Sequence, residues 1–261
     1  MDLTGNVVFI TGSAQGIGKS YADNLLKNHA KVMISDVNKT AGEESEKELA
    51  KKYGKDNVKF ITCDVTNDDQ FEDCIKETIR IFGKLDILIN NAGIALEIEP
   101  HWKKTININF AGLVRGTYLG LKYMGKDVGH NGGTIVNIAS VTSFEPVEFV
   151  PVYSATKSAI NQFSRSMGAK LHYDLTGVKV ITLNPGMTDT AIPNDSGLHL
   201  RPEHKEEFER QKKTRWIMQS VEHMGAGLID VLRKAKSGEM WVIENGKPAK
   251  RFDFIVQKYD E

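Results

Sequence analysis

Short apolar segments alternate with amphipathic ones along most of the chain. The apolar segments are strand-length and rich in β-branched residues, which predicts buried β-strands. The segments between them carry apolar residues at helical spacing; Phe71, Ile75 and Ile79, for example, share one face of a helix that stops at Gly83. The predicted strands cover residues 7–10, 32–35, 58–63, 85–89, 133–140, 178–183 and 239–243.

Strands that alternate with crossover helices predict an α/β fold, in which helices cover both faces of a parallel sheet. Right-handed crossovers then produce a doubly wound Rossmann fold with a seven-stranded parallel sheet, in one domain over residues 1–261. We expect the ligand crevice at the carboxyl ends of the strands. The charged and irregular segment at about 187–220 is interpreted as a substrate lid inserted into this domain.

Composition narrows the choice of partners. Lysine plus arginine equals aspartate plus glutamate at 34 each, so charge does not favour a nucleic acid or an acidic membrane as partner. The apolar runs are too short to span a bilayer, and the first residues do not resemble a signal peptide, so a cytoplasmic protein is expected. Cys63 and Cys74 lack CxxC spacing and the histidines lack HExxH spacing, so neither a disulfide framework nor a metal site is predicted.

A glycine-rich turn, 11–18, follows the first predicted strand and opens a helix with the spacing G-x-x-x-G-x-G. Glycine lets a backbone approach a pyrophosphate closely, and the free N–H groups of a helix start favour its negative charge. A glycine-rich connection without a ligand is the alternative. Asp36 favours the nucleotide site, because an acid at the end of the second strand can bind the adenosine ribose hydroxyls. The predicted contacts in this part are Gly12, Gln15, Gly16, Ile17, Gly18, Asp36 and Val37.

Asp36 also discriminates between the two nicotinamide cofactors. A carboxylate repels a 2′-phosphate, whereas NADP sites usually supply arginine or lysine there. Gln15 is neutral and Val37 is apolar, and Lys39 is interpreted as a solvated lysine at a helix start. NAD is therefore the predicted cofactor.

Three groups that could move a proton follow the fifth predicted strand. Ser140 ends that strand, and Tyr153 and Lys157 are four residues apart on one helix face. A cation beside a phenol favours the phenolate, and a phenol tuned in this way can exchange a proton with an alcohol. A routine Tyr–Lys pair on a helix is the alternative.

Five motifs together resemble the short-chain dehydrogenase/reductase family over essentially the whole chain. They are 11–18, Asn90-Asn91-Ala92-Gly93, the Ser140 strand, Tyr153-xxx-Lys157 and Asn184-Pro185-Gly186. Within the family, 102–109 and 116–124 are most similar to 15-hydroxyprostaglandin dehydrogenase-like and insect alcohol dehydrogenase-like members.

The resemblance implies a catalytic tetrad of Asn109, Ser140, Tyr153 and Lys157. Tyr153 would be the acid/base, Ser140 would bind the substrate oxygen, and Lys157 would lower the Tyr153 pKa and bind the nicotinamide ribose. Asn109 would hold a helix distortion that relays the proton, with Asn107 as a competitor for that role. The cofactor contacts that the resemblance implies, beyond Tyr153 and Lys157, are Asp64, Val65, Asn91, Gly93, Pro185, Gly186, Thr188 and Thr190.

The expected substrate is hydrophobic. Ser140, Val150, Tyr153, Met187 and Trp216 are predicted to contact it, and Trp216 with Met218 to close the lid. Prostaglandin-oxidising relatives place glutamine where this chain has Val150, which argues against prostaglandin itself. The apolar residues expected near the crevice are Val141, Phe144, Val147, Val150, Met187, Ile192 and Trp216.

The combined prediction is an NAD-dependent oxidoreductase that interconverts a secondary alcohol and a ketone on a lipid-, terpenoid- or steroid-like substrate. A carbonyl reductase working in the reverse direction is the alternative within the same class. A catalytically silent cofactor-binding or storage protein is the alternative from another class. The family resemblance also implies a homodimer or homotetramer.

Overall fold

The structure is a computed structural model that describes residues 2–190, 192, 200 and 202–254. Their sheet contains the seven predicted strands, all parallel, in the order β3-β2-β1-β4-β5-β6-β7. An eighth strand, β8 (Lys250–Phe252), pairs antiparallel with β7 and was not predicted. The parallel strands are β1 (Val7–Thr11), β2 (Lys31–Asp36), β3 (Val58–Thr62), β4 (Ile87–Asn90), β5 (Gly133–Ile138), β6 (Val178–Pro185) and β7 (Met240–Ile243).

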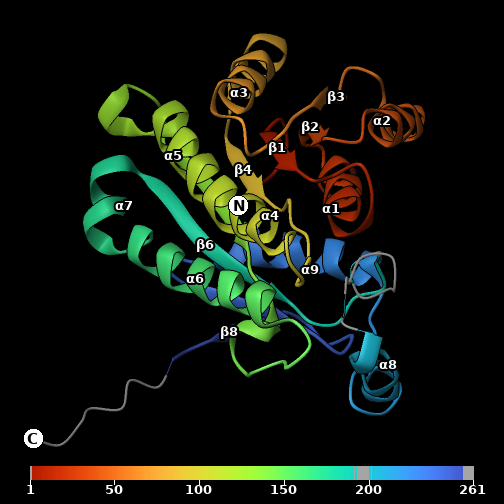
Figure 1. Cartoon of the computed structure of the whole chain (residues 1–261). Helices are drawn as coiled ribbons and strands as arrows, with labels where there is room; N and C mark the ends of the chain where they lie inside the picture. Colours follow the sequence, from red (N-terminus) through yellow and green to blue (C-terminus); the bar gives the residue numbers. More distant parts are fainter. Residues whose placement is uncertain (1, 191, 193–199, 201, 255–261) are drawn as a thin grey trace, which may run out of the picture.

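Helices cover both faces of this sheet (Figure 1). The crossovers confirm the doubly wound α/β fold, and the order of the strands reverses between β1 and β4. The helices are α1 (Gly16–Lys27), α2 (Lys39–Tyr53), α3 (Asp68–Phe82), α4 (Trp102–Ile106), α5 (Leu113–Met124), α6 (Pro151–Met167), α7 (Lys170–Thr176), α8 (Lys205–Thr214) and α9 (Val221–Lys234).

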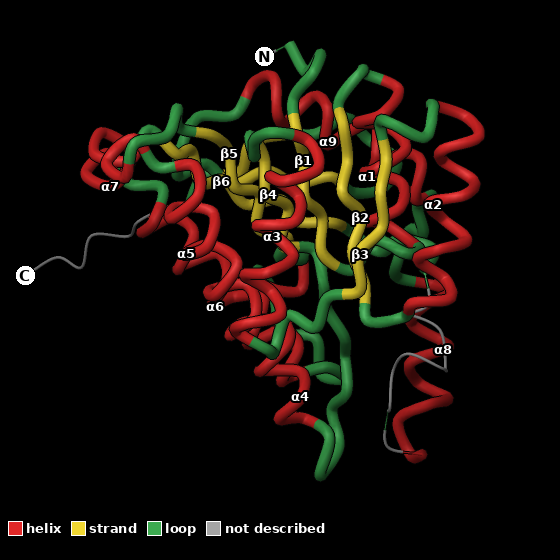
Figure 2. The backbone as a smooth tube through the Cα atoms, turned by 90° about the horizontal axis from the view of Figure 1, so that it is seen from above, coloured by secondary structure: helices red, strands yellow, loops and turns green. Residues whose placement is uncertain are grey.

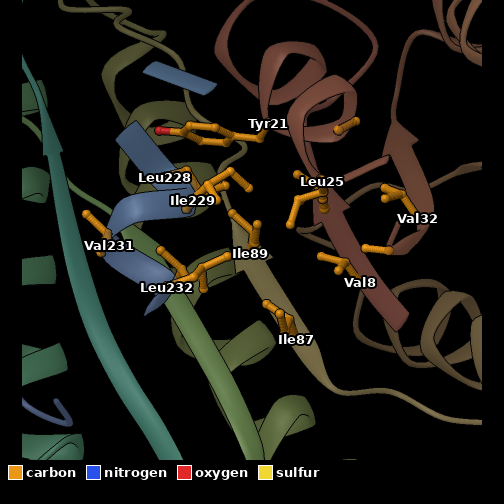
Figure 3. Close-up of a cluster of buried hydrophobic side chains, with 14 of the residues drawn as sticks. Val8, Tyr21, Leu25, Val32, Ile87, Ile89, Leu228, Ile229, Val231 and Leu232 are labelled. Carbon is orange, nitrogen blue, oxygen red and sulfur yellow. The ribbon is translucent and has the colours of Figure 1, made fainter. Parts of the chain in front are cut away.

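Two apolar layers hold the helices on the sheet. On one face, residues of α1, α2 and α9 pack on β1, β2 and β4; Tyr21, Leu25 and Leu228 are fully buried there (Figure 3). On the other face, Phe71 and Ile75 of α3 and Leu119 of α5 pack on the same strands. Buried parallel strands are apolar on both faces, which is why their continuous Val- and Ile-rich runs predicted them.

The segments beyond the carboxyl ends of the strands form one side of the site. Figure 2 shows α4 and α8 projecting beyond the same end of the sheet. The lid segment predicted at about 187–220 contributes α8 here, while residues 191, 193–199 and 201 lie outside the described residues. Within the part of the chain that the structure describes, no helix is long and apolar enough to cross a membrane.

Candidate active site

One cavity of about 1010 Å³ lies at the carboxyl ends of the parallel strands. All the residues predicted to bind the cofactor line it, as do all those predicted to contact the substrate. Sequence positions from Gly12 to Trp216 thus meet around one space, because each follows a parallel strand and such strands end at the same edge of the sheet. Asn109 is the one predicted site residue that lies behind the wall, fully buried.

The glycine turn is shaped by close packing against the turn after β4. Gly12 has φ +61°, and a Cβ there would lie 2.7 Å from the Cα of Ala92. A Cβ on Gly18 would lie 2.4 Å from the carbonyl oxygen of Gly12. Asn91 locks the turn, since its Nδ2 donates to the carbonyl oxygens of Thr11 at 3.0 Å and Gly12 at 2.8 Å.

The start of α1 has the features of an anion site. Its N-cap residue, Gln15, makes no side-chain capping bond, and the first turn carries no acidic side chain. Gly16 lines the cavity, and a Cβ there would meet nothing closer than Thr190 at 3.6 Å. Uncapped N–H groups at a helix start that borders a cavity fit the pyrophosphate of a dinucleotide.

The Asp36 carboxylate is held at the end of β2 by two backbone donors. Oδ2 accepts from the N–H of Ala14 at 3.1 Å, and Oδ1 accepts from the N–H of Asn38 at 3.0 Å. Each carboxylate oxygen keeps acceptor capacity for a further donor such as a ribose hydroxyl. Lys39 pairs with Glu43 at 3.7 Å, is largely exposed and does not line the cavity. The residues present therefore fit the adenosine ribose of a dinucleotide.

The phenol, hydroxyl and amine predicted to act together lie at one wall of the cavity. Ser140 caps the short 3₁₀ helix Val141–Ser143 and hydrogen-bonds Tyr153. The Lys157 ammonium lies 5.3 Å from the centroid of the Tyr153 ring and donates to the carbonyl oxygen of Ile138 at 2.8 Å. One helix turn between Tyr153 and Lys157 puts both on the face that meets the end of β5.

The pKa of Tyr153 corrects one expectation. Burial raises it to about 12, against the opposing effect of the hydrogen bond to Ser140, whereas a lowered value was predicted. Burial also lowers the pKa of Lys157 to about 7. Because Lys157 is itself cut off from water, its charged form is disfavoured near neutral pH, and this weakens the cation that was expected to favour the phenolate.

Asn109 lies in a distorted part of the continuous helical stretch that runs from α4 to α5. The α-helical pattern gives way to a π-helix over Asn107–Gly112. Asn109 Oδ1 accepts from the N–H of Ile94 at 2.9 Å, and Nδ2 donates to the carbonyl oxygen of Ile94 at 2.8 Å and to Thr156 Oγ1 at 3.2 Å. Asn107 is exposed. Asn109 is thus the asparagine that connects to the Tyr153 helix.

A buried polar network below Ser140 was missed by sequence reasoning. Ser143 Oγ donates to the carbonyl oxygen of Ser140 at 2.6 Å and accepts from Asn161 Nδ2 at 2.6 Å. Asn161 Nδ2 also donates to Asn184 Oδ1 at 2.9 Å. The asparagine of the Asn-Pro-Gly motif therefore supports the turn that carries Ser140, a role its position in the motif did not reveal.

The substrate end of the cavity is mainly apolar. All seven apolar residues predicted there line it, from Val141 to Trp216. Phe208 of α8 and Phe252 of β8 complete the wall and were not predicted. Met218, which was predicted to help close the lid, does not line the cavity, whereas its neighbour Ile217 does.

Fold and cavity together define an α/β oxidoreductase of the dinucleotide-binding class. The family model described as short chain dehydrogenase matches residues 6–199. The 15-hydroxyprostaglandin dehydrogenase [NAD(+)] of Macaca fascicularis is 41% identical over 192 residues, which are 74% of this chain and 71% of the relative. Alcohol dehydrogenase 2 of Ceratitis capitata is 33% identical over 251 residues, 96% of this chain and 95% of the relative. The chain belongs to the short-chain dehydrogenase family.

A solved structure supports the fold. The NADPH-dependent 3-quinuclidinone reductase of Rhodotorula rubra superposes with a TM-score of 0.76, covering 94% of this chain and 92% of that one at 24% identity. This likeness confirms the doubly wound fold, and the family model confirms the expected family. The protein is an oxidoreductase that uses a nicotinamide dinucleotide.

Proposed function

We propose that the protein is an NAD-dependent dehydrogenase that interconverts a secondary alcohol and a ketone on a hydrophobic substrate. The observation that carries this proposal is the meeting of Ser140, Tyr153 and Lys157 at the apolar end of a cavity whose other end has a glycine turn and Asp36. A dinucleotide in this cavity would have its nicotinamide end beside the three polar groups.

In the oxidising direction, the alcohol loses a proton and a hydride to become a ketone. Bound NAD supplies the acceptor for the hydride. The Tyr153 phenolate takes the hydroxyl proton, and the Ser140 hydroxyl donates to the substrate oxygen, where a fixed donor stabilises developing charge. Lys157, which lines the cavity, would hold the nicotinamide ribose. We infer that Asn109 takes part in returning the proton to water; it is linked to the Tyr153 backbone through Thr156, which accepts from Asn109 Nδ2 and donates to the Tyr153 carbonyl oxygen.

Asp36 supports NAD over NADP. The basic residues that line the described part of the cavity are Lys157 and Arg215, and neither follows β2. Val37, next to Asp36, is 65% exposed and apolar, so no cation meets a 2′-phosphate there. The printed name of the Macaca relative also specifies NAD. A carboxylate alone at this position disfavours a second negative group.

The apolar lining supports a lipid-, terpenoid- or steroid-like alcohol. Val150 and Phe144 cannot hydrogen-bond a substrate, and Trp216 packs edge-on to Phe149 with ring centroids 6.4 Å apart. We infer that selectivity comes from shape and apolar contact. Prostaglandin is the substrate named for one relative, but the valine at position 150 argues against it here.

The test is a screen at the nicotinamide absorbance of isopropanol, cyclohexanol, menthol, testosterone and a hydroxy fatty acid ester, with NAD and NADP, and of the matching ketones with NADH and NADPH. We expect turnover with NAD and a bulky apolar alcohol, at a higher kcat/KM than with isopropanol. Faster ketone reduction with NADPH would favour the reductase alternative. No turnover with any pair would overturn the proposal in favour of a catalytically silent protein.

Three wider proposals accompany this one. The segment at about 187–220 acts as the substrate lid, supported by α8 and Trp216 at the cavity. The protein forms a homodimer or homotetramer, as the family commonly does. It works in the cytosol, supported by Cys63 and Cys74, which hydrogen-bond each other as free thiols.

A further inference from the structure

The helix that carries Tyr153 begins without a local cap. Its N-cap residue, Val150, has no polar side chain, and Pro151 at the first helical position has no N–H. The first intrahelical bond runs from the N–H of Ser154 to the carbonyl oxygen of Val150 at 2.9 Å. The N–H groups of Val152 and Tyr153 therefore need an acceptor from elsewhere in the chain.

Glu97 supplies both acceptors from the loop after β4. Its Oε1 accepts from the N–H of Tyr153 at 2.8 Å, and its Oε2 accepts from the N–H of Val152 at 2.9 Å. Helices α2, α3 and α9 are capped instead by their own N-cap side chains. Charged acceptors make stronger hydrogen bonds than neutral ones, and a negative charge at a helix start also interacts favourably with the helix dipole.

The Glu97 carboxylate is half-buried where it accepts these two hydrogen bonds. Burial raises the pKa of Glu97, while the two N–H donors of α6 act against that rise. In the described part of the chain no basic side chain pairs with it. A carboxylate removed from water needs compensating bonds, and here the start of α6 provides them.

The loop that carries Glu97 is anchored to α4 and to the π-helix that follows it. Thr105 Oγ1 accepts from the N–H of Leu96 at 3.0 Å and donates to the Leu96 carbonyl oxygen at 2.8 Å. Ile94 is bound in the same two-way fashion by Asn109. The position of Glu97 is thus set by α4 and the π-helix, and α4 packs against α6 (Figure 2).

The other side of the Tyr153 peptide is held as well. Thr156 Oγ1 donates to the carbonyl oxygen of Tyr153 at 2.7 Å and accepts from Asn109 Nδ2. The backbone of Tyr153 is therefore held at its N–H by Glu97 and at its carbonyl by Thr156, and both contacts lead to the helix that contains Asn109.

We propose that Glu97 is a positioning residue that fixes Tyr153 at the start of α6, so that the phenol stays within reach of Ser140 and the substrate oxygen. This inference rests on the proposed role of Tyr153 as acid/base. Glu97 does not line the cavity and acts through the backbone of Tyr153.

The test compares Glu97→Ala and Glu97→Gln with the wild type, using NAD and the alcohol of highest kcat/KM from the panel above. Asp86→Ala is the matched control, because the Asp86 carboxylate also accepts from a distant backbone N–H, that of Val7 at 2.7 Å, at the start of β1 and outside the cavity. Steady-state kinetics, NAD affinity by calorimetry and thermal unfolding are measured for each variant.

We expect Glu97→Ala to lower kcat about 100-fold, the scale on which a displacement of about 1 Å affects catalysis, while NAD affinity changes less than about twofold. Glu97→Gln keeps one acceptor oxygen, so its kcat should lie between those of the wild type and Glu97→Ala. The ionisation limb of kcat should also move to higher pH, because the hydrogen bond to Ser140 lowers the Tyr153 pKa and a displaced phenol loses it. Asp86→Ala should lose thermal stability but keep its kcat.

A kcat for Glu97→Ala equal to that of the wild type, or to that of Asp86→Ala at equal loss of stability, would overturn the inference. If Glu97→Ala does not fold, Glu97→Gln decides by the same readouts, an unchanged kcat and pH limb counting against it. Tyr153→Phe distinguishes failure of the proposed function from failure of the role of Glu97. If Tyr153→Phe is active, the proposed function itself is rejected. If Tyr153→Phe is inactive and Glu97→Ala is fully active, only the role of Glu97 is rejected.

Discussion

Two tyrosines on helices, one fully buried and one at the wall of the cavity, show what distinguishes a proton-transfer group from a core residue. Tyr21 of α1 is fully buried, and its ring lies above Leu228 and Ile229 of α9 (Figure 3). Its hydroxyl has no hydrogen-bond partner among the described residues. Tyr153 of α6 instead borders a cavity, forms a hydrogen bond with Ser140 and lies beside Lys157.

Burial raises the pKa of both phenols, so burial alone does not create an acid/base. Tyr153 differs from Tyr21 in three features of its surroundings. The hydrogen bond to Ser140 lowers its pKa, the Lys157 amine lies near its ring, and the cavity beside it leaves space for a substrate. Among the described residues, no hydrogen bond opposes the rise of the Tyr21 pKa, and Tyr21 does not line the cavity.

The largest expected effect is that of Tyr153→Phe. Loss of general acid/base catalysis typically lowers a rate by about 10² to 10⁴-fold, so kcat should fall by at least about 100-fold. NAD affinity should stay nearly unchanged, because the ring that borders the cavity remains. Steady-state oxidation and calorimetric NAD binding test this, and substantial remaining turnover would count against the assignment.

Lys157→Met should separate stability from activity in the cofactor-free protein. Burial lowers the pKa of Lys157 from 10.5 to about 7. Below pH 7 the full cost of burying the ammonium therefore reduces the free energy of unfolding, and this cost disappears as the pH rises from 7 to about 10.5. At pH 6 the free energy of unfolding of the variant should exceed that of the wild type by a few kcal/mol. Loss of the hydrogen bond from Lys157 to the Ile138 carbonyl oxygen reduces this gain.

Denaturant unfolding of both proteins at several pH values measures the effect of Lys157→Met. The stability difference should shrink steadily between pH 7 and 10.5, while the activity of the variant stays low throughout. A difference that is constant over this range would mean that Lys157 is not buried as a cation in the folded protein.

Asp36→Ala tests the opposite end of the cavity from Tyr153. Hydrogen bonds to a charged group contribute about 1.5–3 kcal/mol, so kcat/KM for NAD should fall at least about tenfold, and the preference for NAD over NADP should relax. Asp86→Ala is the control, since the Asp86 carboxylate also accepts from a backbone N–H but does not line the cavity. Equal kcat/KM ratios in Asp36→Ala and the wild type would contradict the role of Asp36.

The smallest effect is expected from Tyr21→Phe. Removing a buried hydroxyl without a partner relieves its desolvation cost, so the free energy of unfolding should rise by about 1 kcal/mol, or about 2–4 °C in Tm. Activity should be unchanged. A loss of stability would show that the Tyr21 hydroxyl is bonded, for example to an internal water.

Most of the fold could be predicted from the sequence because buried parallel strands are continuous apolar runs. β8 escaped because Lys250 and Arg251 are exposed on an edge strand and carry no apolar pattern. Phe208 of α8 and Phe252 of β8 line the cavity and were not predicted. The cavity residues that could be predicted lie in segments that follow parallel strands. Their convergence then depends only on parallel topology.

What the sequence could not reveal depends on contacts between distant segments. Glu97 binds backbone N–H groups 55 and 56 residues away, and a backbone donor leaves no mark in the sequence. The pKa of Tyr153 was predicted with the wrong direction because Tyr–Lys spacing shows a neighbouring charge but not how far both groups are removed from water.

The central claim is that Tyr153 transfers the proton, and its most direct test is the pH dependence of the single-turnover rate of NAD reduction in the wild type and in Tyr153→Phe. The wild-type rate should rise with pH through one ionisation, and the small remaining rate of the variant should be flat over the same range. A variant that keeps the wild-type ionisation limb would show that another group takes the proton.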